Sequence, residues 1–490
     1  MAGMRKETPV PESCMKITHM AQKVNNPKWD EETDIVVIGS GLAGLAAAIE
    51  AKIAGCSVIV LEKMKGYGGN STISDGVMAA AGTAMQADRG IEDSPQMMYA
   101  DMVKAGLGLN QPELVRTVTE QSNETLQWTI GYLGVKYLDR VDQFGGHSVA
   151  RCYTPHNRSG SAFIKQMLIK LKELDIPVRT KAFLQTFLKD PDDRVCGERV
   201  REGYRYPDEN SGVLKTISAR KAVILATGGF ANDIDFRTSQ DPRLDRDIMS
   251  TNKYSTTGEA LREAIRIGAM PVHLSWIQLG PWACPDEKGY GIGPDFASYI
   301  AFPYGIVIDP ATGKRIMNEL ADRKMRADAI LQKGHPCIVL TDKKGVECSG
   351  YQIEHCLKKG IVKAFQQIDA LADEYNIPVR ELKDTIKTFN ISVENGVDET
   401  FGKPILPDAR PLTHLPYYAM RVWPKVHHTM GGVLINANAQ VLDLSKQPLK
   451  SFYAAGEVAG GVHGASRLGS CAITDCLVFG RIAGRNAASN

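Results

Sequence analysis

Three glycines at positions 39, 41 and 44 and an acid at position 62 have the types and spacing needed to bind phosphate and ribose. Gly39 permits a tight turn, Gly41 lets the backbone approach a pyrophosphate, and Gly44 lets a helix pack closely on a strand. Glu62 lies 23 residues after Gly39, where a carboxylate can accept hydrogen bonds from the two ribose hydroxyls of an adenosine. The pattern predicts a dinucleotide site and leaves open whether the dinucleotide is FAD or NAD.

The elements that must position these residues form a βαβ unit. The apolar run 34–38 is expected to be a strand, the alanine-rich run 45–53 a helix, and 56–61 a second strand that ends at the acid. A lone Gly-x-Gly-x-x-Gly is weak evidence, but here strand, turn, helix and second strand follow one another in the right order. Two further glycine-rich segments, 66–71 and 222–229, favour FAD over NAD.

The composition is that of a globular protein. The 490 residues include 58 Lys and Arg against 56 Asp and Glu, a formal charge of +2, and 43% are hydrophobic. This balance argues against nucleic-acid binding by bulk charge, and no run reaches the roughly 18 apolar residues of a membrane span. Residues 1–32 lack the pattern of a signal peptide, so a cytoplasmic protein is expected. Ten scattered cysteines without a Cys-x-x-Cys pair predict no iron–sulfur cluster, covalent haem or other metal site.

A second glycine-dense segment, near the C-terminus, carries an unusual amount of polar chemistry. It holds, in chain order, His427, His428, Glu457, His463, Arg467 and Ser470. Taken with the dinucleotide unit, it resembles the flavoprotein of the fumarate reductase and succinate dehydrogenase family. The closest resemblance is to the flavin domains of soluble flavocytochrome c fumarate reductases and urocanate reductases, and it spans about residues 34–485.

The resemblance implies an α/β fold in which a Rossmann-like FAD-binding domain of the glutathione-reductase type is interrupted by an α+β capping domain. On that template, residues 1–31 form an N-terminal extension, 32–271 and 429–490 form the two parts of the FAD-binding domain, and 272–428 form the cap. Substrate would lie at the domain junction, against the flavin ring. The FAD should be noncovalent, because Asn70-Ser71-Thr72 stands where succinate dehydrogenases carry a tethering histidine.

The resemblance also implies a reaction, the reduction of the carbon–carbon double bond of an α,β-unsaturated carboxylic acid. In the family, flavin N5 delivers hydride to the β-carbon and a protein acid protonates the α-carbon. That acid is an arginine in an Asn-Glu-x-x-x-Arg segment that follows Gly-x-Arg. The sequence from Gly313 through Asn318 to Arg323 fits this pattern, so Arg323 is the expected proton donor.

Arg467 and His428 are carried over from the family as carboxylate clamps. A planar guanidinium grips a carboxylate with two parallel hydrogen bonds, and the histidine supplies one more. Because adjacent side chains of an extended segment point to opposite sides, only His428 is expected to face the site, and His427 is expected to face away.

The resemblance assigns a further set of residues to the cofactor, with Glu457 placed at the ribityl or ribose hydroxyls. The expected FAD-binding residues are Gly39, Gly41, Leu42, Ala43, Gly44, Glu62, Lys63, Gly69, Asn70, Ser71, Gly76, Ala182, Ala226, Thr227, Gly228, Gly456, Glu457, Ser470, Ala472 and Ile473.

The sequence departs from the family at the distal end of the substrate site. Where dicarboxylate reductases have His-Pro-Thr at the start of the cap, this chain has Gly280-Pro281-Trp282, so the second carboxylate site is missing. Trp282, Tyr299 and His463 are expected to line a pocket that accepts an apolar or aromatic group. Fumarate should therefore be a poor substrate, and a monocarboxylic enoate of the acrylate, cinnamate or urocanate type a better one.

Proton resupply to Arg323 is also expected to differ from the family. Ser298 and Ala301 stand where the family uses a glutamate and an arginine as a relay. The alternatives in this chain are Asp295, Asp322, Tyr299 and water.

Two other functions stay open at this point. A 3-ketosteroid dehydrogenase or reductase shares the FAD domain and favours tyrosine-bearing pockets, but usually lacks the His-Gly-Ala-x-Arg-Leu-Gly segment that begins here at His463. A flavin-binding electron-transfer partner would have no substrate of its own. In each case electrons must come from a separate reductase, a redox subunit or free reduced flavin, because the single dinucleotide fingerprint is used by FAD.

Overall fold

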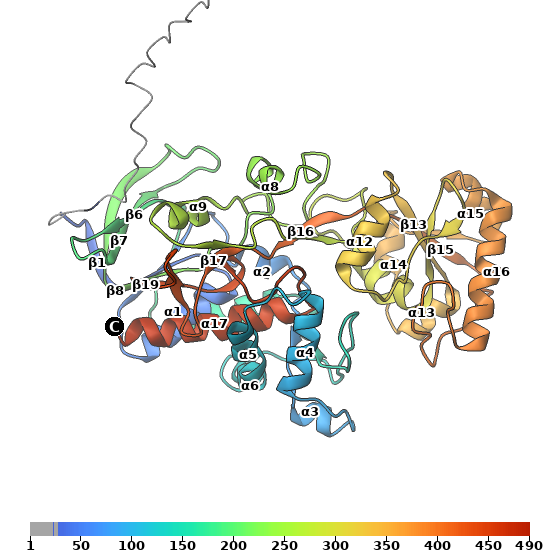
Figure 1. Cartoon of the computed structure of the whole chain (residues 1–490), viewed down its shortest axis with the longest axis horizontal. Coiled ribbons are helices and arrows are strands. Elements are labelled where there is room, and N and C mark those ends of the chain that lie inside the picture. The colour runs from blue at the N-terminus through green and yellow to red at the C-terminus, as the bar shows by residue number, and fades with distance from the viewer. Residues whose placement is uncertain (1–22, 24–27) are drawn as a thin grey trace, which may run out of the picture.

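The computed structural model describes Lys23 and residues 28–490, so most of the expected N-terminal extension lies outside the described residues. Figure 1 shows two lobes side by side. The larger lobe contains both the first and the last part of the described chain, and the smaller lobe contains the middle part, drawn in yellow and orange. An α/β lobe interrupted by an inserted α+β lobe is the fold class that the sequence predicts, and it is confirmed.

In the described part of the chain, eight strands form the main sheet of the larger lobe. Their order is β18-β19-β8-β1-β2-β5, with β6 and β7 joined to β8. The strands are β1 (Glu31–Ile38), β2 (Val58–Glu62), β5 (Val178–Thr180), β6 (Ala182–Lys189), β7 (Val195–Glu202), β8 (Val213–Leu225), β18 (Gln440–Leu442) and β19 (Pro448–Ala454). β1 pairs in parallel with β8 and β2. Because both faces of this centre are covered, Ile35, Val36 and Val37 are fully buried.

Two long helices pack on this sheet, α1 (Leu42–Ile53), which makes the crossover from β1 to β2, and α17 (Cys471–Ala488) near the C-terminus. A Cβ at Gly480 would lie only 2.5 Å from the carbonyl oxygen of Ala43, so a glycine there lets α17 approach the backbone of α1. The other helices of the lobe are α2 (Gly69–Ile73), α3 (Ala84–Ala87), α4 (Pro95–Ala105), α5 (Pro112–Glu120), α6 (Ser122–Gly131), α7 (Ser161–Glu173), α8 (Ile234–Gln240) and α9 (Glu259–Arg266). None of the described helices has both the length and the apolar character needed to cross a bilayer.

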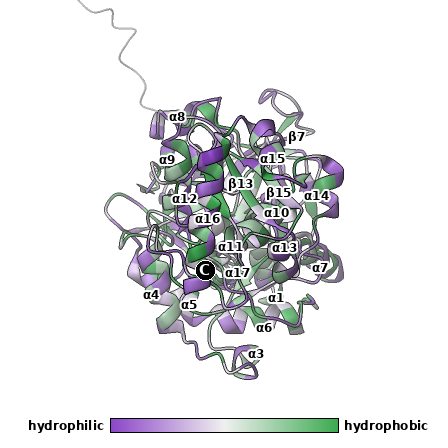
Figure 2. Ribbon diagram, turned by 90° about the vertical axis from the view of Figure 1, so that its right-hand side faces the viewer, coloured by the Kyte–Doolittle hydropathy of each residue, from purple (hydrophilic) through white to green (hydrophobic). Residues whose placement is uncertain are grey.

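The smaller lobe, which we call the cap, is built on an antiparallel sheet in the order β12-β11-β13-β15-β14. Its strands are β11 (Ile306–Asp309), β12 (Lys314–Arg315), β13 (Cys337–Asp342), β14 (Lys363–Phe365) and β15 (Tyr417–Val422). Its helices include α10 (Gly293–Phe296), α11 (Phe302–Tyr304), α12 (Arg323–Leu331), α13 (Lys343–Ser349), α14 (Glu354–Lys359), α15 (Ile368–Tyr375) and α16 (Val379–Asn395), and a π-helical turn, Ala297–Ala301, lies between α10 and α11. Figure 2 turns the cap toward the viewer, with β13 and β15 in the middle of the picture.

Side chains along the cap strands alternate between the two faces of the sheet, and each face has its own hydrophobic core. Val307 and Val339 pack into one cluster with Phe296 and Phe302, and the neighbouring Ile306, Ile308 and Leu340 pack into the other cluster with the helices α15 and α16. Side chains of a strand point to opposite faces with a period of two, so one strand can serve both cores.

The chain passes between the two lobes twice, and the two connecting strands pair with each other. β10 (Ile277–Gly280) enters the cap, β16 (Lys425–Thr429) leaves it, and the two strands are antiparallel. Of the expected cap limits, residue 272 ends β9 (Pro271–Val272), which pairs with β17 (Gly432–Leu434) of the larger lobe, and residue 428 lies within β16. We propose the paired strands β10 and β16 as the boundary between the domains.

Candidate active site

A cavity at the C-terminal ends of β1, β2 and β8 has the walls expected of a dinucleotide site. Gly39 has a φ of +108°, and a Cβ there would lie 2.2 Å from the carbonyl oxygen of Ala226. A Cβ at Gly44 would lie 2.0 Å from the carbonyl oxygen of Gly39. A Cβ at Gly41 would meet only Ser71 Oγ, at 3.4 Å. Gly39 and Gly44 are therefore needed for packing, and Gly41 opens the first turn of α1 to the cavity.

The groups around this turn are arranged to receive phosphate and ribose. The N-cap of α1, Gly41, has no side chain to cap the helix, and although Ser71 Oγ accepts the N–H of Leu42 at 3.2 Å, other N–H donors of the first turn are available for an anion. The carboxylate of Glu62 is oriented by Ser40, whose hydroxyl donates to Oε2 at 2.6 Å, and by the N–H of Met64, which donates to Oε1 at 2.9 Å. This set of donors and acceptors, with an open path along Gly41, fits the pyrophosphate and ribose of FAD.

Most of the residues expected at the cofactor line this cavity. They are Gly39, Gly41, Leu42, Ala43, Glu62, Lys63, Gly69, Asn70, Ser71, Ala182, Ala226, Thr227, Gly228, Gly456 and Glu457. The ammonium of Lys63 is engaged by Glu259 at 2.9 Å and by Thr257 at 2.8 Å. Gly76 does not line this cavity, and a Cβ there would be 2.6 Å from the backbone nitrogen of Gly160, so close packing requires glycine at this position.

A second cavity continues from the first, which we call the site cavity. The two share Leu42, Asn70, Ser71, Glu457 and Cys476. The expected cofactor residues Ser470, Ala472 and Ile473 line the site cavity. The cap and the interlobe link contribute Trp282, Tyr290, Arg323, His427 and His428, and the larger lobe adds residues such as Asp75, Asn252 and Arg467. Substrate bound here would lie between the lobes, next to the inner end of the cofactor cavity.

Arg323 is the first residue of α12, whose N-cap is Asp322. Its guanidinium lies over the ring of Trp282, with Cζ 4.5 Å from the ring centroid, and Nη1 donates to Gln278 Oε1 at 3.4 Å. Burial and the nearby positive charge of Arg467 lower the pKa of Arg323 to about 9. No carboxylate among the described residues forms an ion pair with it.

Arg467 is the second cation of the site cavity. Its side chain is buried, with the residue 6% exposed, and Nε has no hydrogen-bond partner among the described residues. Its carbonyl oxygen accepts from Gln278 Nε2 at 2.9 Å, which links the loop to β10. A buried charge without a partner is costly. Arg467, which is buried, and Arg323, which is half-buried, both face one cavity without a carboxylate partner among the described residues, and this arrangement would suit an anion.

Both histidines of β16 line the site cavity, contrary to the expectation that His427 faces away. The pairing of β10 with β16 explains this result: Gln278 is opposite His428 and Leu279 is opposite Val426, so His427 is the extra residue of a β-bulge. A bulge breaks the alternation of side chains and re-aims one of them. A hydrogen bond of 2.8 Å joins His427 Nδ1 to Thr251 Oγ1.

His428 keeps its expected place. Burial, followed by the positive charge of Arg467, lowers its pKa well below the ordinary value, so the imidazole is neutral near pH 7. Nδ1 lies 3.5 Å from Glu457 Oε1. Glu457 itself accepts the N–H of Thr429 at 2.9 Å, and burial raises its pKa. His428 can thus offer one neutral hydrogen bond to an anion beside Arg467.

The three residues expected in the substrate pocket have different positions. Trp282 lines the site cavity, and its Nε1 has no partner among the described residues. His463 does not line it, because it lies behind His428 with ring centroids 5.6 Å apart and contacts Asp475 at 3.1 Å. Tyr299 lines a neighbouring cavity and donates its hydroxyl to Asp75 Oδ2 at 3.0 Å.

Sequence reasoning missed three residues of the site: Asp75, Tyr290 and Gln278. Asp75 stands in a Ser-Asp-Gly turn directly after α2, and this composition is typical of ordinary turns. Tyr290 lies in a segment rich in glycine and proline without periodicity. Only the folded arrangement brings them to Arg323.

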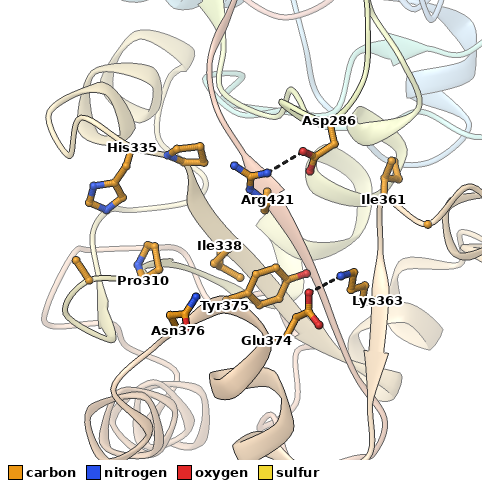
Figure 3. A pocket seen from close by; sticks show the side chains of 13 residues that line it. Asp286, Pro310, His335, Ile338, Ile361, Lys363, Glu374, Tyr375, Asn376 and Arg421 are labelled. Atoms are coloured by element: carbon orange, nitrogen blue, oxygen red, sulfur yellow. Dashed lines mark hydrogen bonds and ion pairs between the residues drawn. The ribbon is translucent and has the colours of Figure 1, made fainter.

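A separate open groove on the cap shares no lining residue with the site cavity. Figure 3 shows its charged side chains in pairs, Arg421 with Asp286 at 2.8 Å and Lys363 with Glu374. Because these charges neutralise one another, the groove offers no free cation to an acid. No cluster of metal-binding side chains is present among the residues that the structure describes.

The fold and the site define a two-lobed flavoprotein oxidoreductase, in which the cavity for the dinucleotide adjoins a second cavity under the cap that Arg323 and Arg467 line. A family model for the FAD binding domain matches residues 34–473, and the chain belongs to this family and binds FAD. The expected family and cofactor are confirmed.

Similar proteins extend this finding. The chain is 43% identical over 474 residues to the acrylate reductase flavoprotein subunit of Shewanella woodyi, covering 95% of this chain and 93% of that protein. It is 32% identical over 469 residues to the urocanate reductase of Eggerthella lenta, covering 94% of this chain and 75% of that protein. Among solved structures, the open conformation of a flavocytochrome c3 fumarate reductase matches with a TM-score of 0.77 and 34% identity, over 94% of this chain and 79% of that one.

Proposed function

We propose that this flavoenzyme reduces the carbon–carbon double bond of a monocarboxylic enoate, with Arg323 as proton donor. The observation that carries the proposal is the pair of guanidinium groups, Arg323 and Arg467, which face one cavity without a carboxylate partner among the described residues. The similarity to reductases of acrylate and urocanate supports the same class of reaction. Bound FAD, held noncovalently and reduced by an external donor, supplies the hydride.

Arg467 and His428 would hold the carboxylate of the substrate. The guanidinium is buried and unpaired, so binding an acid replaces a costly isolated charge by a charge-assisted pair. His428, neutral because of its lowered pKa, adds one hydrogen bond without repelling Arg467. The clamp withdraws charge from the conjugated double bond and stabilises the negative charge that reaches the carboxylate as the β-carbon accepts hydride.

Arg323 would donate the proton to the α-carbon. An arginine with its ordinary, very high pKa is a weak acid. Burial and the charge of Arg467 lower the pKa of Arg323 to about 9, which brings it closer to the range useful for general acid catalysis. Trp282 supports the group from one face without occupying its N–H bonds, of which Gln278 accepts one at 3.4 Å, so others are available to the substrate.

The distal wall favours an uncharged substituent. Trp282, Tyr290 and His427 lie there, and burial lowers the pKa of His427 well below its ordinary value, so it carries no charge near pH 7. A second carboxylate would therefore meet neutral groups on this side. A monocarboxylic enoate therefore suits this wall better than a dicarboxylate such as fumarate does.

Electrons would come from a separate donor, which is a reductase, a redox subunit or free reduced flavin. Most of the expected FAD-binding residues line the dinucleotide cavity, so FAD itself would occupy it. We therefore expect the separate donor to be required for turnover but not for substrate binding.

A substrate panel with dithionite-reduced viologen as donor tests the function without the natural partner. Acrylate, cinnamate and urocanate are compared with fumarate and a 3-ketosteroid, in the native enzyme and in the Arg323→Ala and Arg421→Ala variants. Arg421, paired with Asp286 in the remote groove, is the matched control. We expect turnover of a monocarboxylic enoate, its loss by about 10²–10⁴-fold in Arg323→Ala with FAD retained, and no change in Arg421→Ala. Turnover of fumarate alone, of the steroid alone, or of none of these acids would overturn the proposal.

A further inference from the structure

A third cavity leads away from the site between the two lobes, and we call it the side cavity. It shares four wall residues with the site cavity: Asp75, Trp282, Tyr290 and Arg323. Its other walls come from the larger lobe, through Phe144, and from the cap, through Tyr299 and Tyr351. The side cavity therefore reaches the proposed proton donor from a direction different from that of the cofactor.

Asp75 lies where the two cavities meet. It follows α2, and its carboxylate accepts the hydroxyl of Tyr299 at 3.0 Å and the N–H of Val77 at 3.4 Å. No cation among the described residues forms an ion pair with it. Its negative charge acts on both guanidinium groups, since it opposes the lowering of the pKa of Arg323 and of Arg467.

Tyr299 is fixed in the interface. Its ring stacks on Tyr351 at 4.9 Å between centroids, with an angle of 12° between planes, and Phe144 of the larger lobe lies at 5.7 Å. Burial and the charge of Asp75 raise the pKa of Tyr299 well above its ordinary value, so the hydroxyl stays protonated and donates. The hydrogen bond between Tyr299 and Asp75 joins the cap to the larger lobe beside Arg323.

We propose that Asp75, together with Tyr299, resupplies the proton that Arg323 gives to the substrate. This inference rests on the proposed function. When the α-carbon takes a proton from an N–H of Arg323, a proton returns to the neutral guanidine in one concerted relay. The carboxylate of Asp75 accepts the hydroxyl proton of Tyr299, Tyr299 accepts one from solvent in the side cavity, and Asp75 passes one to the guanidine through solvent in the cavities that both residues line. One solvent proton is consumed in each turnover, and the protein groups move no electrons.

The other acids suggested by the sequence are occupied elsewhere. Asp295 pairs with His355 at 2.8 Å on an exposed part of the cap. Asp322 caps α12 by accepting the N–H of Lys324 at 2.8 Å and that of Met325 at 3.1 Å. The titratable groups that face Asp75 are Tyr290 and Tyr299 from the cap, Arg323 at the start of α12, and Arg467 from the loop before α17. Asp75 is the carboxylate that lines both cavities without a cationic partner.

The test compares Asp75→Asn, Asp75→Glu and Tyr299→Phe with Asp295→Asn as the matched control. We measure the rate at saturating enoate across pH, the solvent deuterium isotope effect on that rate, and the dissociation constant of the saturated acid. In Asp75→Asn we expect about a 10²-fold loss of rate and an unchanged dissociation constant. The rate should then rise as pH falls, because direct protonation from solvent becomes limiting, and the isotope effect should increase. Asp75→Glu should recover part of the rate, and Asp295→Asn should behave as the native enzyme.

Tyr299→Phe removes only the hydroxyl and keeps the ring stack, so it tests the route even if Asp75→Asn is unstable. It should lower the rate in the same direction and leave binding unchanged. A native rate and pH profile in Tyr299→Phe, or in a folded Asp75→Asn variant, would overturn the proposal. So would tighter acid binding at an unchanged rate in Asp75→Asn, because that result assigns Asp75 only an electrostatic influence. Failure of the proposed function is distinct: the native enzyme itself would then reduce no enoate.

Discussion

The guanidinium of Arg323 lies over the indole ring of Trp282, with Cζ 4.5 Å from the ring centroid. The π face of the indole stabilises the cation but accepts no conventional hydrogen bond from it. The N–H groups of Arg323 can therefore donate to other acceptors. An ion pair with a carboxylate would hold the group as firmly but would raise its pKa and compete with the substrate. The contact thus explains how a cation is kept in place and available for an acid.

The pH dependence should report on Arg323. Its pKa is lowered to about 9, and the acid must be protonated to react, so the rate constant kcat should be level at neutral pH and fall as pH rises through about 9. Replacing Arg467 by Gln removes a positive charge that lowers this pKa, so the alkaline limb should move to higher pH. A profile that stays level well beyond pH 9, or a limb that Arg467→Gln moves downward, would contradict the assignment.

Substitution of Arg467 should act on binding. In Arg467→Gln the carboxylate loses its buried charge-assisted partner, and charge-assisted hydrogen bonds contribute about 1.5–3 kcal/mol. We expect the dissociation constant of the enoate to rise by about 10–100-fold at constant FAD content. Titration of the enzyme with the saturated acid measures this without turnover. Unchanged affinity would remove Arg467 from the clamp, and Arg421→Gln in the remote groove serves as control.

The distal wall should set the choice between one carboxylate and two. Gly280 lets the ring of Trp282 fold back over the strand, since a Cβ there would lie 3.2 Å from that ring. Gly280→His with Trp282→Thr restores hydrogen-bonding groups and removes the crowding. We expect the ratio of fumarate to acrylate turnover to rise by about tenfold or more, because a polar group then meets the second carboxylate. We compare the ratio of the two rates because the double variant also removes the indole ring that supports Arg323, which affects both substrates. An unchanged ratio would mean that other residues determine the substrate preference.

The glycines of the first turn should separate into packing and binding roles. A side chain at Gly41 would extend into the open cavity, so Gly41→Val should fold and lose FAD. Gly131→Ala, at a position with open space and an ordinary φ, should keep both fold and FAD. Flavin absorbance and thermal unfolding of the FAD-free protein check the two properties. Full FAD content in Gly41→Val would show that the cofactor does not approach this turn.

Local motifs in the sequence were sufficient to predict the dinucleotide unit. Gly39, Gly41, Gly44 and Glu62 lie within one βαβ unit, where turn, helix start and strand end follow from neighbouring residues, and the structure has each of them. The inserted cap was also predicted, because long ordered motifs on both sides of it resemble one family.

Tertiary structure decided the rest of the site. Arg323 and Arg467 come from different lobes, and their separation is set by the pairing of β10 with β16, which no local pattern encodes. The bulge that turns His427 into the cavity depends on the register of that pairing. The prediction from strict alternation of side chains therefore placed His427 on the wrong side of the strand. Asp75 lies in a segment whose sequence is typical of ordinary turns. Only its contact with the hydroxyl of Tyr299 from the cap distinguishes it from such turn residues. A motif specifies the chemistry of its own segment, whereas contacts between distant segments depend on how the whole chain packs.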